Sequence, residues 1–188
     1  MSADERAHWA SRTAIVTGAV GGQGLAEARM LAAAGAAIVA VDVAAPDDPR
    51  WNALQEAGGR IAIVTEDVGD EATWDLVADA AQAFGRPIGG LVNNAGITLR
   101  KTVTETATDE WERLLRINLT SGFLGIRRIA PLMRDGGAIV NVSSTAGHTG
   151  YFSAAYTATK WAVRGLAKAA AIELAPLGVR VNTLSPGL

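Results

Sequence analysis

A tyrosine and a lysine four residues apart are the side chains best spaced for chemistry in this sequence. Tyr156 and Lys160 stand at i and i+4 of a helical pattern, so they share one helix face. A free tyrosine has a pKa of about 10, and a neighbouring cation favours the phenolate. The pair could therefore act as a general acid–base near neutral pH, although the same spacing also occurs in surface pairs. Ser143 ends an apolar run thirteen residues before Tyr156, where its hydroxyl could bind a substrate oxygen.

A glycine-rich turn near the start of the chain is the second chemical feature. Gly18, Gly22 and Gly24 follow an apolar run and open directly into a helical pattern. Glycines let a backbone turn tightly and approach a pyrophosphate, which then lies at the positive helix N-terminus. The G-x-G-x-x-G spacing does not fit, because Glu27 stands where the third glycine should be. The turn alone is a weak signal, since such turns also occur without a ligand.

Asp42 stands 24 residues after Gly18, at the end of a second apolar run. A carboxylate there can accept hydrogen bonds from an adenosine ribose and would repel a 2′-phosphate. Val43 and Ala44 follow it, and the glycine turn carries no Lys or Arg. This pattern favours NAD and disfavours NADP, while a solvated acid at a strand end is the alternative interpretation.

Apolar runs and helical stretches alternate along the chain and must position these side chains. The runs are near-continuous in Val, Ile and Leu, which is typical of strands buried on both faces. We expect strands over residues 13–17, 37–43, 60–65, 89–93, 137–143 and 179–184, helices over 25–34, 70–84, 108–133 and 153–175, and a polar turn over 44–49. The alternation predicts an α/β fold, a doubly wound parallel sheet of Rossmann-like type, in a single domain over residues 1–188.

Composition excludes several classes of protein. The 188 residues include no Cys and two His, and the formal net charge is −2. A disulfide scaffold and a Cys- or His-rich metal site are excluded, so we expect no metal. The charge argues against a nucleic-acid partner. Residues 1–12 have no apolar core and the run 30–41 is too short to span a bilayer, so we expect no membrane partner and a cytoplasmic setting.

The order of these motifs resembles the short-chain dehydrogenase/reductase family over essentially the whole chain. The family's T-G-x-x-x-G-x-G turn is matched by residues 17–24, its N-N-A-G by 93–96, its helix asparagine by Asn118, its serine by Ser143, its Y-x-x-x-K by Tyr156 and Lys160, and its P-G by Pro186 and Gly187. Gln23 departs from the usual aliphatic residue of the turn, where backbone contacts dominate. Motifs that are weak singly are specific when they occur together in this order.

The resemblance implies an NAD-dependent oxidoreductase that interconverts a secondary alcohol and a ketone by hydride transfer. Tyr156 would be the general acid–base, Lys160 would lower its pKa and hold the nicotinamide ribose, Ser143 would orient the carbonyl, and Asn118 would anchor a water. The implied cofactor-binding residues are Gly18, Gly22, Gln23, Gly24, Asp42, Asp67, Val68, Asn94, Ala95, Gly96, Tyr156, Lys160, Pro186 and Gly187. The residues expected at the substrate are Ser143, His148, Phe152 and Tyr156.

Two other functions compete with this one. A Ser–His–Asp hydrolase built on Ser143 and His148 is disfavoured, because the sequence has no G-x-S-x-G elbow. An NAD-binding regulatory or scaffold module without turnover is the stronger alternative. Within the dehydrogenase interpretation the substrate stays open between steroid- or terpenoid-like alcohols, acyl thioesters and other alcohols or ketones.

The resemblance also makes 188 residues short. Family members usually continue past the P-G motif into a substrate lid, a further helix and a seventh strand. We therefore expect a chain truncated at its C-terminus, without the lid and the last strand, and with residues 179–184 as an exposed edge. The helical stretches 111–133 and 153–175 resemble those that the family packs between subunits, which predicts a homo-oligomer.

Overall fold

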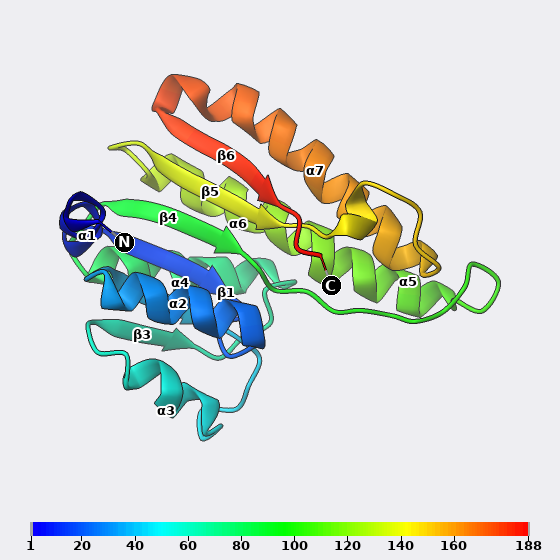
Figure 1. Ribbon diagram of the computed structural model, residues 1–188, viewed down its shortest axis with the longest axis horizontal. Coiled ribbons are helices and arrows are strands. Elements are labelled where there is room, and N and C mark those ends of the chain that lie inside the picture. The colour runs from blue at the N-terminus through cyan, green and yellow to red at the C-terminus, as the bar shows by residue number, and fades with distance from the viewer. Residues whose placement is uncertain (1, 188) are drawn as a thin grey trace.

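The computed structural model describes residues 2–187, in which one parallel sheet lies between two layers of helices (Figure 1). The strands run in the order β3-β2-β1-β4-β5-β6. Their bounds are β1 (Thr13–Thr17), β2 (Ala37–Val41), β3 (Ile61–Val64), β4 (Ile88–Asn93), β5 (Gly137–Val142) and β6 (Val179–Leu184). The chain winds outward from β1 to β3 and then from β4 to β6. This order confirms the doubly wound sheet and places its switch point at the carboxyl ends of β1 and β4.

The helices cover both faces of this sheet. They are α1 (Ala3–Ala10), α2 (Gly22–Ala33), α3 (Arg50–Gln55), α4 (Glu71–Ala83), α5 (Thr108–Leu115), α6 (Ser121–Ile129) and α7 (Ala154–Leu174). In Figure 1, α2 and α3 lie over one face, and α4, α6 and α7 lie over the other. No helix within residues 2–187 combines the length and the hydropathy that crossing a membrane requires.

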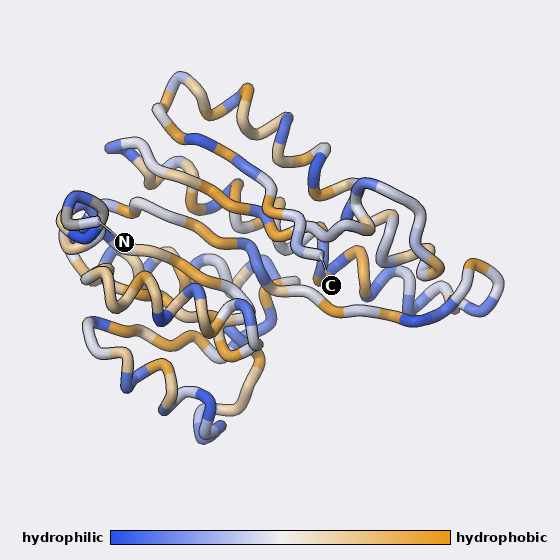
Figure 2. Tube along the Cα trace, viewed as in Figure 1, coloured by the Kyte–Doolittle hydropathy of each residue, from blue (hydrophilic) through white to orange (hydrophobic). Residues whose placement is uncertain are grey.

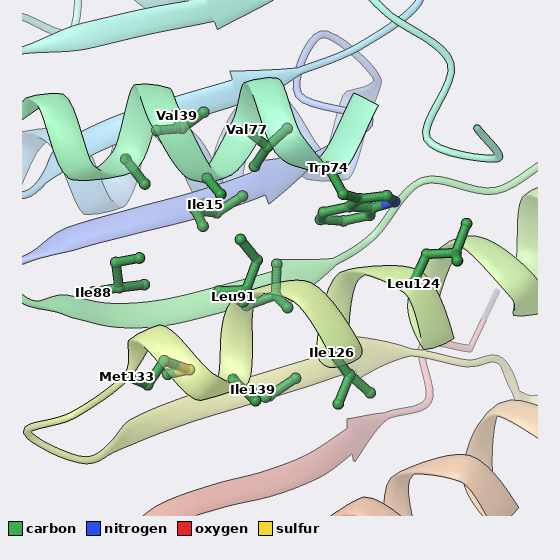
Figure 3. Close-up of a cluster of buried hydrophobic side chains, with 14 of the residues drawn as sticks. Ile15, Val39, Trp74, Val77, Ile88, Leu91, Leu124, Ile126, Met133 and Ile139 are labelled. Carbon is green, nitrogen blue, oxygen red and sulfur yellow. The ribbon is translucent and has the colours of Figure 1, made fainter. Parts of the chain in front are cut away.

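Successive side chains of the central strand enter two separate cores. Ile15 packs with Trp74 and Val77 of α4, whereas its neighbour Val16 packs in the cluster that contains Trp51 of α3. Figure 3 shows the first cluster, with strand residues beneath the side chains of α4 and α6. Hydrophobic segments accordingly follow the strands in Figure 2. Burial on both faces explains why these strands carry no apolar–polar alternation.

The stretch predicted as one helix over residues 108–133 is divided in the structure. Between α5 and α6 lies a five-residue π-helical segment, Arg116–Thr120, and a 3-10 turn, Ala130–Leu132, follows α6. The Ser121 hydroxyl donates to the Ile117 carbonyl (2.5 Å) at the end of the π segment. Such local widening of a helix is frequent at functional sites, and this segment carries Asn118.

Other boundaries also differ from the sequence-based expectation. Helix α1 was not predicted, and α3 starts directly after the stretch that we expected to be a polar turn. Strand β2 ends at Val41, so Asp42 lies just beyond it. Both helices are short, with eight and six residues, and α3 is held by the buried side chains of Trp51 and Leu54. Tertiary burial, rather than a strong local pattern, accounts for that helix.

Candidate active site

Two adjoining hollows lie at the carboxyl ends of the strands. The first, of about 440 Å³, lies by the glycine turn, Asp42 and Asp67. The second, of about 260 Å³, is lined by Ser143, Tyr156 and Lys160 among others. Both hollows share four lining residues, Gln23, Asn94, Gly96 and Ile97. The site is therefore an elongated depression at the switch point, where doubly wound sheets bind their ligands.

The glycine turn is shaped so that its backbone faces the first hollow. Gly18 has a φ of +65°, and a Cβ added to Gly24 would lie 2.1 Å from the Gly18 carbonyl oxygen. Helix α2 begins at Gly22 without a side-chain cap, and its first residues line the hollow. The first amides of a helix have no partner within the helix. This end of α2 therefore fits a pyrophosphate, and a side chain at Gly24 would destroy the turn.

Thr17 ties the glycine turn to the N-N-A-G segment, a role that the sequence analysis missed. Its Oγ1 accepts hydrogen bonds from the amides of Asn94 and Ala95 (both 3.0 Å), and the Asn94 side chain donates to the Thr17 carbonyl (3.0 Å). Asn93, one residue earlier, donates its side-chain amide to Asn141 on β5 (2.9 Å). These bonds fix the floor shared by the two hollows.

Asp42 lies at the edge of the first hollow with both carboxylate oxygens in use. They accept the amides of Val20 and Ala44 (both 3.1 Å), so the acid also holds the glycine turn against β2. Arg50 of α3 lines the same hollow and forms two hydrogen bonds with Asp48 (2.9 and 2.7 Å). This cation was not predicted from the sequence, because it is the fold of α3 that brings it back toward Asp42.

Lys160 is the most deeply buried charged group of the site. It is 4% exposed, and its Nζ donates to the Val142 carbonyl (2.9 Å). Burial lowers the pKa of this ammonium to about 8. The Nζ lies 5.5 Å from the centre of the Tyr156 ring, and the Ser143 hydroxyl donates to the Lys160 backbone carbonyl (2.8 Å). The structure thus brings the serine, the tyrosine and the lysine to one hollow.

Asn118 lies behind the wall of this hollow. Its side chain makes a two-way pair with the backbone of Ile97, accepting from the amide (2.8 Å) and donating to the carbonyl (2.9 Å). It also donates to Thr159 (3.3 Å), the residue before Lys160. A Cβ on Gly96 would meet both the Asn118 Oδ1 (3.4 Å) and the Lys160 Nζ (3.5 Å). The π segment therefore sets Asn118 beside the lysine.

Gly147 and Arg164 support Ser143, and the sequence analysis identified neither. A Cβ on Gly147 would lie 2.5 Å from the Ser143 Oγ and 2.8 Å from the Lys160 carbonyl oxygen. Arg164, one turn after Lys160, donates to the Gly147 carbonyl (2.5 Å). The close approach of this turn to α7 needs a glycine. The one sequence feature that could have indicated this contact is the glycine four residues after Ser143.

The structure does not bring His148 and Phe152 into the hollow with Tyr156. His148 lines a separate hollow with Arg164, and its ring pairs with the Ser185 hydroxyl (2.9 Å). Phe152 is 54% exposed and packs on Tyr151. His148 follows directly after the 3-10 turn Thr145–Gly147 as its C-terminal cap residue. Thr98 lines the hollow instead.

Within residues 2–187, no group of three or more His, Asp or Glu side chains is arranged to hold a metal ion.

A parallel switch-point sheet, a glycine turn and a Ser–Tyr–Lys hollow define the class of nicotinamide-dinucleotide dehydrogenases. The chain belongs to the short chain dehydrogenase family, whose family model matches residues 12–188. It is 40% identical to trans-4-hydroxycyclohexanecarboxylate dehydrogenase of Sinomonas cyclohexanicum, over 95% of this chain and 72% of that protein. It is 41% identical to a 3-alpha-(or 20-beta)-hydroxysteroid dehydrogenase of Mycobacterium bovis, over 94% of this chain and 68% of that protein.

A solved structure agrees with these relatives. The short chain dehydrogenase of Mycobacterium paratuberculosis bound to NAD superposes with a TM-score of 0.88 at 33% identity, covering 94% of this chain and 72% of that one.

Proposed function

We propose that this chain is an NAD-dependent dehydrogenase that interconverts a secondary alcohol and a ketone. The observation that carries the proposal is the second hollow, in which Ser143, Tyr156 and Lys160 meet, joined to the first hollow with its glycine turn. A scaffold that only binds NAD needs the glycine-turn hollow and has no need of the side chains of Ser143, Tyr156 and Lys160. The buried lysine beside Tyr156 argues for chemistry, because burial of an ammonium is costly without a use for it.

The chain's own residues fit a nicotinamide dinucleotide along the joined hollows. The space beside Gly18 and Gly24, which a Cβ would fill, suits a pyrophosphate, and the Asp42 carboxylate suits an unphosphorylated adenosine ribose. Asp67 and Val68 would contact the adenine, and Pro186 and Gly187 line the catalytic end. The other residues proposed to hold the cofactor are Gly22, Gln23, Asn94, Ala95, Gly96, Tyr156 and Lys160.

The preference for NAD over NADP is the finer part of this proposal. The negative charge of Asp42 opposes a 2′-phosphate, whereas Arg50 in the same hollow would attract one. Arg50 already pairs with both oxygens of Asp48, which leaves Asp42 as the uncompensated charge. The comparison with an NAD-bound relative supports the same choice.

In the proposed reaction, the Tyr156 oxygen acts as a phenolate and takes the proton of the alcohol, with the Lys160 Nζ 5.5 Å from the centre of its ring. Bound NAD supplies the acceptor for the hydride that leaves the carbinol carbon. The Ser143 hydroxyl, which now donates to the Lys160 carbonyl, turns to the substrate oxygen and orients it. Asn118 keeps the Ile97 backbone in place and anchors a water of the proton relay. In the reverse direction Tyr156 returns the proton to the carbonyl oxygen.

We propose alicyclic secondary alcohols as the substrate class. The two relatives named above are named for alcohols on rings, a cyclohexane and a steroid. The test is NADH formation from a panel of cyclohexanols, hydroxysteroids and 3-hydroxyacyl thioesters with NAD and with NADP. NADH formation from ring alcohols is expected. Tight NAD binding without turnover of any of them would favour the regulatory module, and a preference for NADP would overturn the cofactor assignment.

We also propose a homodimer formed through α5, α6 and α7. Exposed aromatic side chains lie on these helices: Trp111 (37%), Phe123 (45%) and Trp161 (49%). Exposed aromatic residues are typical of interfaces. Light scattering at micromolar concentration tests this, and a monomer would contradict it. The cytoplasmic setting stays a prediction.

A further inference from the structure

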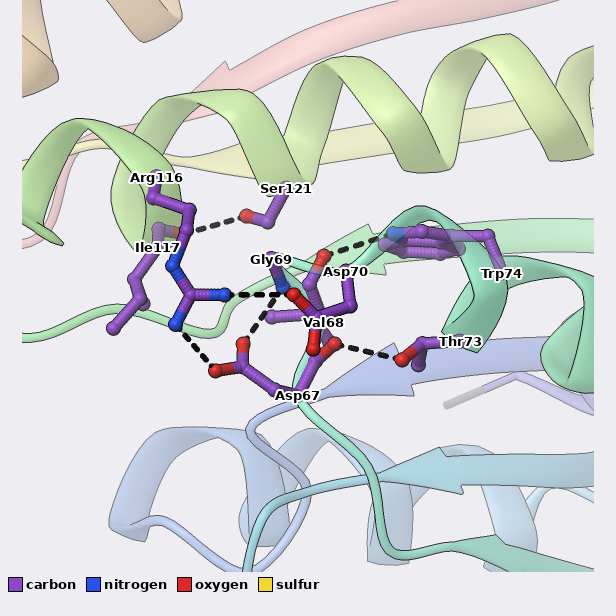
Figure 4. Close-up of polar contacts among 9 residues, drawn as sticks. All are labelled: Asp67, Val68, Gly69, Asp70, Thr73, Trp74, Arg116, Ile117 and Ser121. Carbon is purple, nitrogen blue, oxygen red and sulfur yellow. Dashed lines mark hydrogen bonds and ion pairs between the residues drawn. The ribbon is translucent and has the colours of Figure 1, made fainter. Parts of the chain in front are cut away.

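The loop between β3 and α4 forms one wall of the first hollow (Figure 4). Its backbone is tied to α4, because Thr73 donates to the Asp67 carbonyl (2.7 Å) and Trp74 donates to the Val68 carbonyl (2.9 Å). One oxygen of the Asp67 carboxylate accepts the Gly69 amide (2.8 Å) within the same loop. These bonds fix the backbone of the loop but leave the second carboxylate oxygen to another partner.

That partner comes from across the hollow. The Arg116 guanidinium donates to the second oxygen of Asp67 (2.6 Å) and to Asp70 (3.1 Å), and it lies against Gly69, where a Cβ would be 2.5 Å from Nη1. Burial opposes ionisation of Asp67, but the Gly69 amide and the Arg116 guanidinium outweigh it and lower the pKa of this carboxyl. Arg116 thus joins Asp67 and Asp70 of the loop and keeps Asp67 charged.

We propose that Arg116 is a positioning residue that fixes the Asp67 carboxylate and the loop wall for the adenine half of NAD. The inference rests on the proposed function, which places adenine at Asp67 and Val68. Arg116 opens the π segment that also carries Asn118, so one five-residue turn serves both ends of the site. Its guanidinium serves the adenine end, and Asn118 serves the catalytic end through Ile97.

The physical effect is preorganisation of the binding wall. Without the guanidinium, the Asp67 carboxylate keeps a single hydrogen bond and can rotate away from the ligand, which a bound adenine would have to reverse. The ion pair is partly exposed, with side chains 41% and 31% accessible, so its effect on overall stability is below about 1 kcal/mol. We therefore expect Arg116 variants to bind adenine nucleotides more weakly while their melting temperature stays close to that of the wild type.

The test is a calorimetric titration of Arg116→Met with AMP, NAD and nicotinamide mononucleotide, which lacks adenine. We expect an affinity for AMP and NAD that is weaker by about fivefold, an unchanged affinity for the mononucleotide, and partial recovery in Arg116→Lys, which keeps one charged contact. The matched control is Arg128→Met, which breaks a similar bond from α6 to Asp75 of α4 (2.7 Å) outside both hollows. All its affinities are expected to stay within about twofold.

Unchanged AMP affinity in Arg116→Met would overturn the inference, as would an equal loss for AMP and the mononucleotide, because the latter indicates general damage to the π segment. If Arg116→Met does not fold, Asp67→Asn provides the same comparison, and an unchanged AMP affinity there would also overturn it. The titration needs no turnover. Adenine-specific loss in a chain that oxidises no alcohol would support this inference and defeat the proposed function, whereas a wild-type chain that binds neither NAD nor AMP would defeat both.

Discussion

The proposed adenine end and the proposed catalytic end of the site are held by different kinds of contact. At the adenine end, partly exposed charges face each other, as in the pair between Arg116 and Asp67. At the catalytic end, buried side chains bond to the backbone: Lys160 to Val142, and Ser143 to Lys160. Exposed ion pairs contribute little and tolerate change, whereas a buried polar group without its partner is costly. We therefore expect substitutions at the catalytic end to lower the rate of catalysis by a larger factor than substitutions at the adenine end lower the binding affinity.

Removing the buried ammonium is expected to have the largest effect. In Lys160→Met, Tyr156 loses the cation that lies 5.5 Å from the centre of its ring, so we expect kcat to fall by about 10²–10⁴. Steady-state NADH formation measures it, with NADH binding followed by fluorescence. A loss of less than about tenfold would show that the lysine does not assist Tyr156.

The same variant should gain stability near neutral pH. Burial lowers the pKa of Lys160 from 10.5 to about 8, so below pH 8 the ammonium is charged in both states and the folded chain bears the whole desolvation cost. Lys160→Met removes about 3 kcal/mol of that cost and loses one hydrogen bond of about 1 kcal/mol. Urea unfolding should show a free energy of unfolding that is about 2 kcal/mol higher than that of the wild type at pH 7. This difference should become smaller as the pH rises from 8 to 10.5. A variant that is less stable at pH 7 would contradict this account.

Crowding the catalytic serine should have the next largest effect. In Gly147→Ala the new Cβ meets the Ser143 Oγ at 2.5 Å, so the serine or α7 must shift. We expect kcat to fall by about 10–100-fold, and the free energy of unfolding to fall by about 1–3 kcal/mol. Gly150→Ala is the matched control, because a Cβ there meets nothing within 4 Å. Equal losses of activity and stability in Gly147→Ala and Gly150→Ala would show that Gly147 does not support Ser143.

Neutralising the acid at the ribose end should have the smallest effect. Asp42→Asn keeps the shape of the side chain and removes the charge that opposes a 2′-phosphate, while Arg50 remains in the hollow. The ratio of kcat/KM for NAD to that for NADP should fall about tenfold, mostly through KM. An unchanged ratio would mean that Asp42 does not select the cofactor.

Local pattern was sufficient to predict the sheet and the segments that bring Ser143, Tyr156 and Lys160 to one hollow. Continuous apolar runs predicted all six strands of residues 2–187, because burial on both faces leaves a clear trace. The motifs around Gly18, Asn94, Ser143 and Tyr156 lie at strand ends or in the helix that follows. Their spacing along the sequence was therefore enough to predict where they lie in the fold.

The contacts made by distant segments could not be predicted. The π segment does not interrupt the apolar pattern of residues 108–133, so neither the placement of Asn118 nor the reach of Arg116 to Asp67 was visible. Arg50 approaches Asp42 only because α3 folds back. His148 was expected at the substrate, and in the structure its ring pairs with Ser185 and lines a separate hollow.

The most direct test of the account replaces the phenol of Tyr156. In Tyr156→Phe, NADH formation from a ring alcohol and NAD affinity are measured in one preparation beside the wild type. The account predicts that turnover falls by at least about 10²-fold while the dissociation constant for NAD changes by less than about threefold. Turnover at the wild-type rate in Tyr156→Phe would contradict the assignment of the general acid–base and, with it, the proposed reaction.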